Sequence, residues 1–232
     1  MKHPIFLIPG LGADHRNYPG PWTELPGCTS LNWPEYHGKA SMPEIARFMA
    51  DAWQLPPDAI LVGSSFGGML ACELAKILPV HALVLVASTT TRDHFTSTAK
   101  MKRLTRVLPL RLVQLLLRCS RLALEKIWGR SPTPVVRAVL DSIQMFSTCQ
   151  AGFYRNVFQA ISTWEGFADH HTRLVRIHGR HDKLILPPPH ADLYLEGGHL
   201  IVMTHARECV NFIQSWLGRD VNSPGCDGMK MH

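Results

Sequence analysis

The residue with the clearest chemical potential is a serine placed between glycines. Gly63, Ser65 and Gly67 form the pattern G-x-S-x-G at the end of the apolar run 59–63, and a helical pattern begins directly after the serine. Such a tight strand-to-helix turn strains its central residue, and side chains at the flanking glycines would collide with the neighbouring strand and helix. The turn lifts the serine hydroxyl above the sheet edge, at a helix N-terminus that favours negative charge. We therefore interpret Ser65 as a nucleophile and expect Ser64 to be packed; the alternative is an N-cap loop without chemistry.

A serine hydroxyl is a poor nucleophile without a base beside it, so the chain must supply a histidine and a carboxylate. Asp182 and His199 each follow an apolar run that is typical of a buried strand. Because the carboxyl ends of parallel strands lie at one edge of a sheet, these side chains and Ser65 are expected to meet there. In that arrangement His199 is the general base and Asp182 orients its ring. Asp93, which follows another such run, is the alternative acid.

The elements that must position these residues alternate between short apolar runs and helical patterns, which predicts an α/β fold with a parallel sheet covered by helices. Near-continuous apolar character indicates strands buried on both faces. The expected strands are 4–8, 29–33, 59–63, 82–88, 173–179 and 191–197. The expected helices are 41–53, 66–78, stopped by Pro79, and 205–217, stopped by Gly218. Ser41 and Glu44 predict a capping box on the first helix, and residues 183–190 are too few for a crossover helix.

The segment 91–171 breaks this alternation. It carries no strand signal and contains two amphipathic helical patterns split at Pro109. An all-helical insertion between two strands of a sheet is most simply a lid. The chain is therefore expected to divide into a core of residues 1–90 and 172–218, a helical lid over 91–171, and a flexible tail over 219–232.

The stretches IFLIPGLG, GSSFGG, GRHDKL and EGGHL together resemble the α/β-hydrolase superfamily, from residue 4 to about residue 217. The chain is similar to small, lid-bearing bacterial serine hydrolases of the carboxylesterase type. The resemblance implies the α/β-hydrolase fold with a short, mostly parallel sheet of about six strands, since the chain begins at the family's third strand. It also implies an oxyanion hole formed by the backbone N–H groups of Leu11 and Phe66. No cofactor and no metal are required.

This constellation predicts hydrolysis of a carboxylic ester or thioester through an acyl-enzyme. Leucines, valines and Trp128 in the lid segment are expected to face an interior, which favours a small or medium apolar acyl group. The same segment carries the basic residues Lys100, Lys102, Arg103, Arg106, Arg111, Arg118 and Arg121. These form either a solvated face or a docking site for an anionic carrier, such as an acyl-carrier protein or a coenzyme A thioester. Lyase or perhydrolase chemistry, and a slowly turning-over ligand-binding receptor, are alternative functions on this fold.

The composition fits an ordinary soluble globular chain, with 46% hydrophobic and 18% charged residues and a net charge of +6. No aromatic-basic motif accompanies the charge, so nucleic-acid binding is not indicated. The six cysteines form no C-x-x-C pair, which favours reduced thiols in a cytoplasmic protein, and Cys72 is expected in the core. No stretch reaches the roughly 18 apolar residues of a membrane span. The histidine-rich group matches no standard zinc spacing and is expected to be surface or core: Asp169, His170, His171, His178 and His181.

Overall fold

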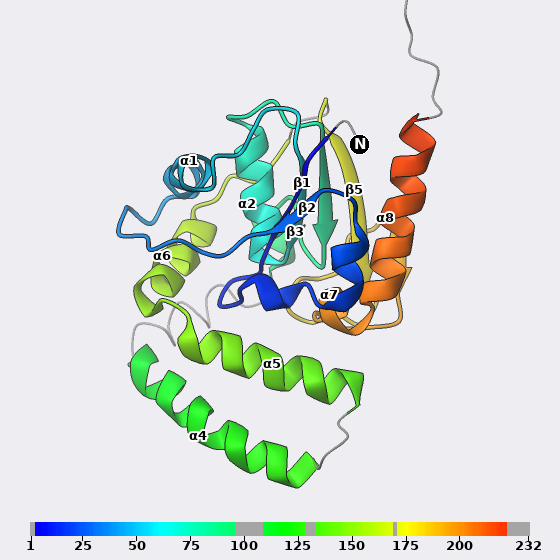
Figure 1. Cartoon of the computed structure of the whole chain (residues 1–232). Helices are drawn as coiled ribbons and strands as arrows, with labels where there is room; N and C mark the ends of the chain where they lie inside the picture. The colour runs from blue at the N-terminus through cyan, green and yellow to red at the C-terminus, as the bar shows by residue number, and fades with distance from the viewer. Residues whose placement is uncertain (1–2, 96–108, 129–132, 169–170, 222–232) are drawn as a thin grey trace, which may run out of the picture.

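The apolar runs of the sequence form one six-stranded sheet in which every strand pair is parallel (Figure 1). The computed structural model describes residues 3–95, 109–128, 133–168 and 171–221. The strands are β1 (Ile5–Ile8), β2 (Cys28–Ser30), β3 (Ile60–Ser64), β4 (Ala82–Val86), β5 (Arg173–Gly179) and β6 (Leu193–Leu195). Their order is β2-β1-β3-β4-β5-β6. The predicted short parallel sheet flanked by helices is therefore confirmed.

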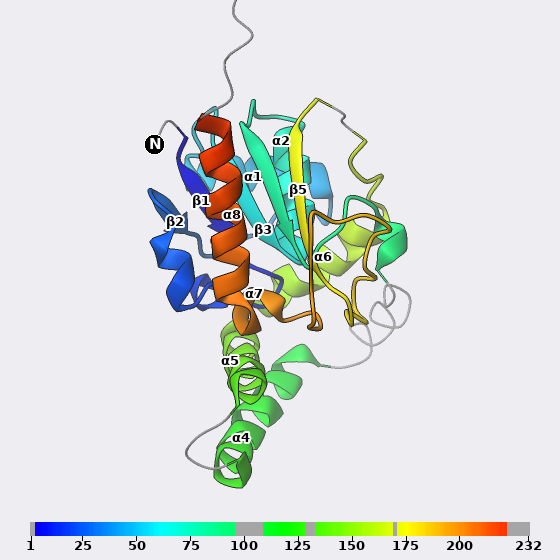
Figure 2. The ribbon, with the colours of Figure 1, turned by 90° about the vertical axis from the view of Figure 1, so that its right-hand side faces the viewer.

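The sheet separates two apolar cores, which explains why its central strands lack alternation. In β3, Leu61 contributes to one core, while Ile60 and Val62 contribute to the other. Helices α1 (Met42–Trp53), α2 (Phe66–Ala75) and α6 (Ala151–Ser162) cover the first face. Helix α8 (Ala206–Val221) covers the second face (Figure 2). Because side chains of the two cores cover both faces of the sheet, every residue of β3 and β4 is buried.

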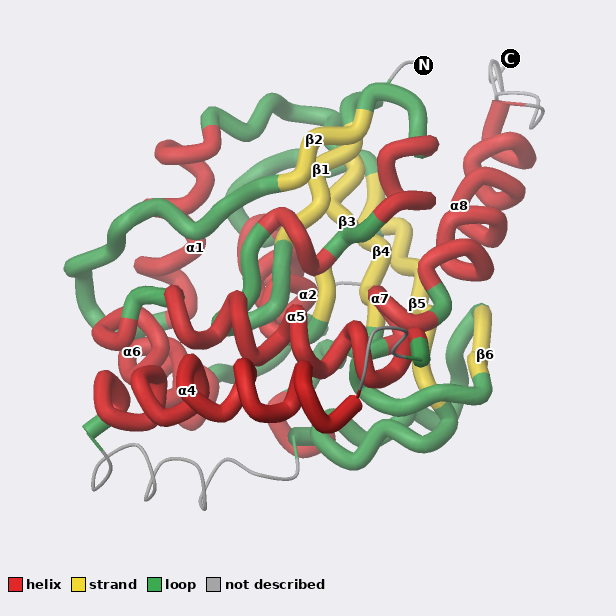
Figure 3. Tube along the Cα trace, turned by 60° about the horizontal axis from the view of Figure 1, so that its bottom comes forward, coloured by secondary structure: helices red, strands yellow, loops and turns green. Residues whose placement is uncertain are grey.

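Between β4 and β5, the described residues form helices with only an isolated bridge pairing Phe95 with Ile185. After a short 3₁₀ turn, η3 (Arg92–His94), come α4 (Leu110–Trp128), α5 (Pro134–Thr148) and α6. Helix α4 begins directly after Pro109, as the sequence predicts, and the helical pattern expected before this proline lies outside the described residues. Figure 3 shows α4 and α5 side by side, beyond the carboxyl ends of the strands. No described helix has the length and apolarity needed to cross a membrane.

Three local predictions are wrong. Helix α8 continues through Gly218 to Val221, because one glycine in a helix costs only about 1 kcal/mol and the upstream turns are anchored by Ile213. Helix α2 ends at Ala75 rather than at 78. The capping box does not form at Ser41, whose N–H donates to Lys39 O, while the Glu44 carboxylate accepts from Lys39 Nζ.

Several short elements have no counterpart in the sequence prediction. They are η1 (His15–Asn17), η2 (Gly20–Glu24) and α7 (Ile201–Thr204). The connection from β5 to β6 contains no helix, as expected from its length. Of the tail expected to be flexible, residues 219–221 belong to α8 and residues 222–232 lie outside the described part.

Candidate active site

The glycine-flanked serine lies in a sharp turn between β3 and α2. Ser65 has φ 52° and ψ −122°, a conformation that L-residues rarely adopt. A Cβ on Gly63 would lie 2.4 Å from Gly67 O, and one on Gly67 would lie 2.3 Å from Ile8 O. Both glycines are therefore needed for the close approach of α2 to β3 and β1. The Ser65 N–H donates to Val86 O at 3.0 Å, which ties the turn to β4.

The structure brings the three predicted side chains together at the carboxyl edge of the sheet. His199 Nε2 lies 2.9 Å from Ser65 Oγ, and His199 Nδ1 lies 2.8 Å from Asp182 Oδ2. Since the carboxylate only accepts, Nδ1 carries the proton, which leaves Nε2 to accept from the serine hydroxyl. A continuous hydrogen-bonded chain thus runs from a strained serine to a carboxylate with no exposed surface.

Asp182 is held on both of its oxygens. Oδ1 accepts from the N–H groups of Leu184 and Ile185, at 2.9 and 3.0 Å. Oδ2 pairs with His199 and also lies 3.3 Å from Nε2 of His178. Burial by itself opposes ionisation of the carboxyl, but the hydrogen bonds from His178, His199 and Leu184 outweigh it and hold the pKa of Asp182 well below its usual range.

His178 is the site residue whose role the sequence did not predict. It lies in β5, is 1% exposed, and its Nε2 is 3.0 Å from Ile185 O as well as near Asp182. Both neighbours are acceptors, so Nε2 carries the proton. The sequence does contain a signal for this role, because it places a histidine at the end of a predicted strand, four positions before Asp182. The sequence does not show the turn that brings Asp182 back toward His178. In the structure, Asp182 N donates to Gly179 O at 3.2 Å and closes this turn.

The other candidates lie elsewhere. Asp93, the alternative acid, is exposed, and its carboxylate accepts from Thr91 Oγ1 at 3.4 Å rather than reaching His199. His181 is exposed and pairs with Glu196 at 3.1 Å, and His171 is also exposed. Asp169 and His170 lie outside the described residues.

Ser64 and Cys72 are both packed inside the protein, as the sequence predicts. Ser64 is 3% exposed. Cys72 is fully buried in α2, and this burial raises the pKa of its thiol far above the usual value, so the thiolate needed for nucleophilic chemistry is disfavoured. Both predictions are confirmed.

The two backbone amides expected to form an oxyanion hole both line the cavity that contains Ser65. Phe66 is the first residue of α2, where an N–H has no acceptor within the helix. Leu11 lies in a turn closed by Ala13 N donating to Gly10 O at 3.1 Å. Within the described part of the chain, the N–H of Leu11 has no protein acceptor. Neither N–H group thus has an acceptor among the described residues, as the donors of an oxyanion hole require.

The cavity above Ser65 has a volume of about 260 Å³ and a predominantly apolar wall. Helices α5 and α6 supply much of this wall, together with residues of α2, α7 and the loops. The large apolar side chains include Phe66, Met69, Phe95, Met145, Phe146, Tyr154, Phe158, Ile161 and Leu184. This arrangement offers an apolar compartment next to the serine hydroxyl, and electrostatic interactions are stronger where water is excluded.

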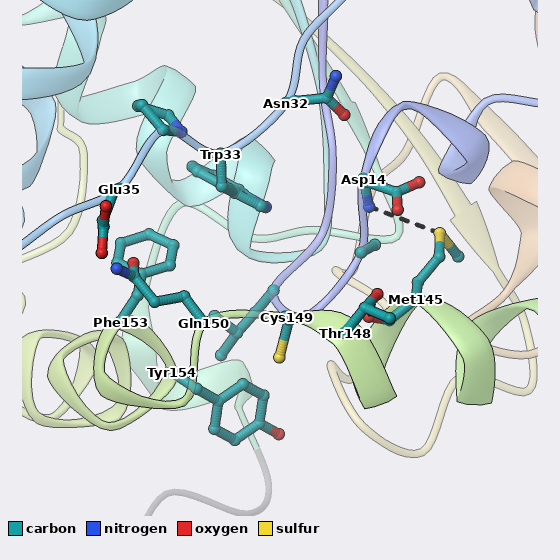
Figure 4. A pocket seen from close by; sticks show the side chains of 14 residues that line it. Asp14, Asn32, Trp33, Glu35, Met145, Thr148, Cys149, Gln150, Phe153 and Tyr154 are labelled. Carbon is teal, nitrogen blue, oxygen red and sulfur yellow. Dashed lines mark hydrogen bonds between the residues drawn. The ribbon is translucent and has the colours of Figure 1, made fainter. Parts of the chain in front are cut away.

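A second cavity, of about 360 Å³, is shown in Figure 4 and shares the segment Leu11–Ala13 with the first. Its wall is more polar and includes Asp14, Asn32 and Glu35. The rings of Trp33 and Phe153 form its apolar part, with centroids 5.2 Å apart. The two cavities share Met145 and Tyr154 as well as the segment between them. A ligand with an apolar part and a polar part would find both environments here.

Among the described residues, one group has metal-ligand chemistry: His3, Asp58 and His81, at the opposite edge of the sheet. The two imidazole rings are stacked, with centroids 3.6 Å apart and planes 17° apart. A metal ion in the plane of one stacked ring lies out of the plane of the other, so this arrangement does not suit coordination by both. Each Nδ1 instead pairs with the Asp58 carboxylate, at 2.8 and 3.3 Å.

Comparisons with known proteins agree with this fold. The fold is similar to a thermophilic esterase from Thermogutta terrifontis, with a TM-score of 0.68 and 16% identity over 94% of this chain and 90% of that one. It is also similar to the enol-lactonase from Burkholderia xenovorans LB400, with a TM-score of 0.67 and 15% identity over 94% and 92% of the two chains. Similarity at this level of identity shows the fold. Among curated protein sequences, none matches. The sequence profile described as "Alpha/beta hydrolase family" matches residues 5–214, and the chain therefore belongs to that family.

Proposed function

We propose that this protein is a serine hydrolase that cleaves a carboxylic ester or thioester with a small or medium apolar acyl group. The observation that carries the proposal is the unbroken chain from Ser65 Oγ through His199 to Asp182, which opens on an apolar cavity. The strained backbone of Ser65 serves no evident structural purpose beside this cavity. A nucleophilic serine, in contrast, needs a hydroxyl that the substrate can reach and a base hydrogen-bonded to it.

In the first half of the reaction, Ser65 Oγ attacks the acyl carbon while His199 Nε2 takes the hydroxyl proton. Asp182 holds the ring in the tautomer that leaves Nε2 free and stabilises the imidazolium that forms. The oxyanion accepts from the N–H groups of Leu11 and Phe66. Each such donor is typically worth about 10²–10³ in rate. His199 then gives the proton to the departing alcohol or thiol.

In the second half, water attacks the acyl-enzyme with His199 again as the base, and the acid leaves with Ser65 restored. The depressed pKa of Asp182 supports this role, because the carboxylate stays ionised throughout the pH range in which an imidazole accepts a proton. Every step uses side chains and amides of residues that line the cavity beside Ser65 or are hydrogen-bonded to it.

The two cavities support a substrate in two parts. The 260 Å³ cavity beside Ser65 suits an apolar acyl chain, and the 360 Å³ cavity with Asp14, Asn32 and Glu35 suits a more polar alcohol part. Two of the similar structures are described as an esterase and an enol-lactonase, which also favours an ester as the bond that is cleaved. Of the basic residues named for an anionic carrier, Arg118 and Arg121 are bonded within the protein and Arg111 is exposed. The remaining four, Lys100, Lys102, Arg103 and Arg106, lie outside the described residues, and a carrier at this surface stays a prediction.

The test is a panel of p-nitrophenyl esters and matching thioesters of increasing acyl length, assayed with the wild-type chain, Ser65→Ala and the control Ser120→Ala. Ser120 lies on α4, where its hydroxyl donates to Leu117 O at 3.0 Å. The proposal expects turnover that peaks at short or medium chains, is abolished in Ser65→Ala and is kept in Ser120→Ala. Equal turnover by Ser65→Ala and the wild type, or none with any ester or thioester, would overturn it.

A further inference from the structure

Among its described side chains, α4 buries Leu110 and Gln114, and two polar side chains bond it to the end of α5. Gln114, which is 8% exposed, donates from Nε2 to Phe146 O at 3.0 Å and to Cys149 O at 2.8 Å. Arg118 donates from Nε and Nη2 to Ser147 O, at 3.1 and 2.8 Å. These carbonyls end α5, where no further turn of helix supplies donors. The C-terminus of α5 is therefore capped by α4, and this capping fixes the rotation of α4 about its axis.

The opposite side of α4 is consequently an apolar stripe directed at solvent. We call it the outer stripe and define it by Leu112, Leu115, Leu116, Cys119, Ala123 and Ile127, which share one side of the helix because, apart from the adjacent pair 115–116, they lie three or four residues apart. The exposed fractions of Leu115, Leu116 and Ile127 are 55%, 60% and 73%. A single exposed leucine is ordinary, but a continuous line of them along a helix marks an interaction surface.

A positively charged side chain lies at each end of the outer stripe. Arg111 is exposed beside Leu112, and Lys126 is exposed beside Ile127. The acid nearest to them in α4, Glu125, is paired with Arg121 at 2.8 Å. The stripe is thus bounded by positive charge on a chain whose net charge is +6.

No described helix or strand covers this side of α4. In Figures 1 and 2, α4 is the outermost of the described helices at the end of the molecule that carries α5, and α5 separates it from the sheet. None of the described elements therefore stands between this side of the helix and a flat surface.

We propose that the outer stripe of α4 binds the surface of an anionic phospholipid membrane. The leucines enter the boundary between head groups and acyl chains, and Arg111 and Lys126 contact the phosphates. An amphipathic helix with an apolar face and cationic margins has the chemistry for this mode of binding, which needs no membrane-spanning segment. The inference goes beyond the proposed hydrolysis and does not depend on it.

Charge favours a lipid surface over a second copy of this chain. In a parallel pair of stripes, Arg111 meets Arg111 and Lys126 meets Lys126, and in an antiparallel pair Arg111 meets Lys126. Either arrangement brings like charges together beside an apolar contact, which weakens association. Anionic head groups instead complement both ends of the stripe.

The experiment measures sedimentation of the full chain with vesicles of phosphatidylglycerol and phosphatidylcholine, compared with phosphatidylcholine alone. Binding is expected only to the anionic vesicles and is expected to weaken with salt. Arg111→Gln with Lys126→Gln should weaken binding about thirtyfold. The matched control, Arg47→Gln with Arg155→Gln, removes the same charge from exposed positions on α1 and α6 and should change it little.

The apolar contribution is tested by Leu115→Gln with Leu116→Gln, against Ile77→Gln, which changes a side chain that is 40% exposed at the end of α2. The leucine pair should abolish binding and leave the thermal midpoint unchanged, and the control should bind normally. In the wild-type chain, anionic vesicles should protect the exposed Cys119 from modification by maleimide. This measurement tests the outer stripe without any substitution in it.

Three results would overturn the inference: no binding to anionic vesicles, binding that the leucine variants leave intact, or a dimer in light scattering that these variants dissociate. Ser65→Ala should bind vesicles like the wild type. Loss of hydrolysis and loss of membrane binding are therefore separate outcomes, and either proposal can fail alone.

Discussion

His178 Nε2 lies 3.3 Å from Asp182 Oδ2, inside the protein, so that one carboxylate oxygen faces two imidazoles. Only His199 touches the serine hydroxyl. His178 is fixed in β5, and its second contact, to Ile185 O, lies in the loop that carries Asp182. The contact joins the rigid sheet to the acid of the proposed triad, and we interpret His178 as a positioning residue.

The first prediction concerns this contact. His178→Phe keeps the ring volume but removes the donor, and it is expected to lower kcat/KM by about tenfold, because a hydrogen bond to a charged group is worth about 1.5–3 kcal/mol. His178→Gln places an amide N–H where Nε2–H lies and should restore most of the activity. Steady-state kinetics on a p-nitrophenyl ester, with thermal midpoints, measure both. Equal activity in the two variants would assign His178 a packing role only.

The second prediction concerns pH. The pKa of Asp182 is lower in the folded than in the unfolded chain, so its ionisation stabilises the fold fully above the ordinary carboxyl value, about 3.9. That contribution is lost as the pH falls from there toward the folded pKa. Asp182→Asn cannot ionise. Urea unfolding should show a constant stability difference between wild type and Asp182→Asn near neutral pH, and a shrinking one below about pH 4. A difference that grows on acidification would contradict this sign.

The third prediction concerns backbone strain at Ser65, where φ is 52°. Ser65→Gly removes the Cβ that makes this conformation costly, whereas Ser65→Ala keeps it. Both variants are expected to lose hydrolysis, but the glycine variant should be the more stable by about 1 kcal/mol, at the low end of the cost of such strain. Denaturant unfolding of the two inactive variants measures the difference directly. An alanine variant as stable as the glycine variant would show that the turn is unstrained.

The fourth prediction compares two glycines. A Cβ at Gly67 would lie 2.3 Å from Ile8 O and 2.5 Å from Pro9 O, both backbone atoms. Gly67→Ala must therefore push α2 away from β1 and is expected to cost about 2–4 kcal/mol and to displace Ser65. Gly152 in α6 has no atom within 4 Å of an added Cβ, and Gly152→Ala should be neutral or slightly stabilising. Thermal unfolding of the two variants checks the contrast.

The sequence predicts the parts of the site that follow from local pattern and sheet geometry. Ser65, Asp182 and His199 each follow a strand, and strands of a parallel sheet end at one edge, so their meeting needs no knowledge of loop detail. The absence of a helix before β6 follows from the few residues between the two apolar runs, whereas the order of the strands in the sheet was not predicted. Gly218 shows the limit of such rules, because a helix stop signal is overridden when packing on the core extends α8.

The parts that the sequence did not predict depend on contacts between distant segments. The role of His178 depends on a turn that folds Asp182 back onto β5. The direction of the leucines of α4 depends on Gln114 and Arg118 reaching the end of α5. A helical pattern identifies an apolar side but not what that side faces, so the sequence assigned these leucines to an interior.

The central claim is that His199 and Asp182 activate Ser65. Its most direct measurement is labelling of the full chain with a fluorophosphonate, followed by peptide mass spectrometry to locate the adduct. The account predicts a single adduct on Ser65, none in Ser65→Ala, and labelling at least about 10³-fold slower in His199→Ala. An adduct on another residue, or labelling of Ser65 at an undiminished rate without His199, would contradict it.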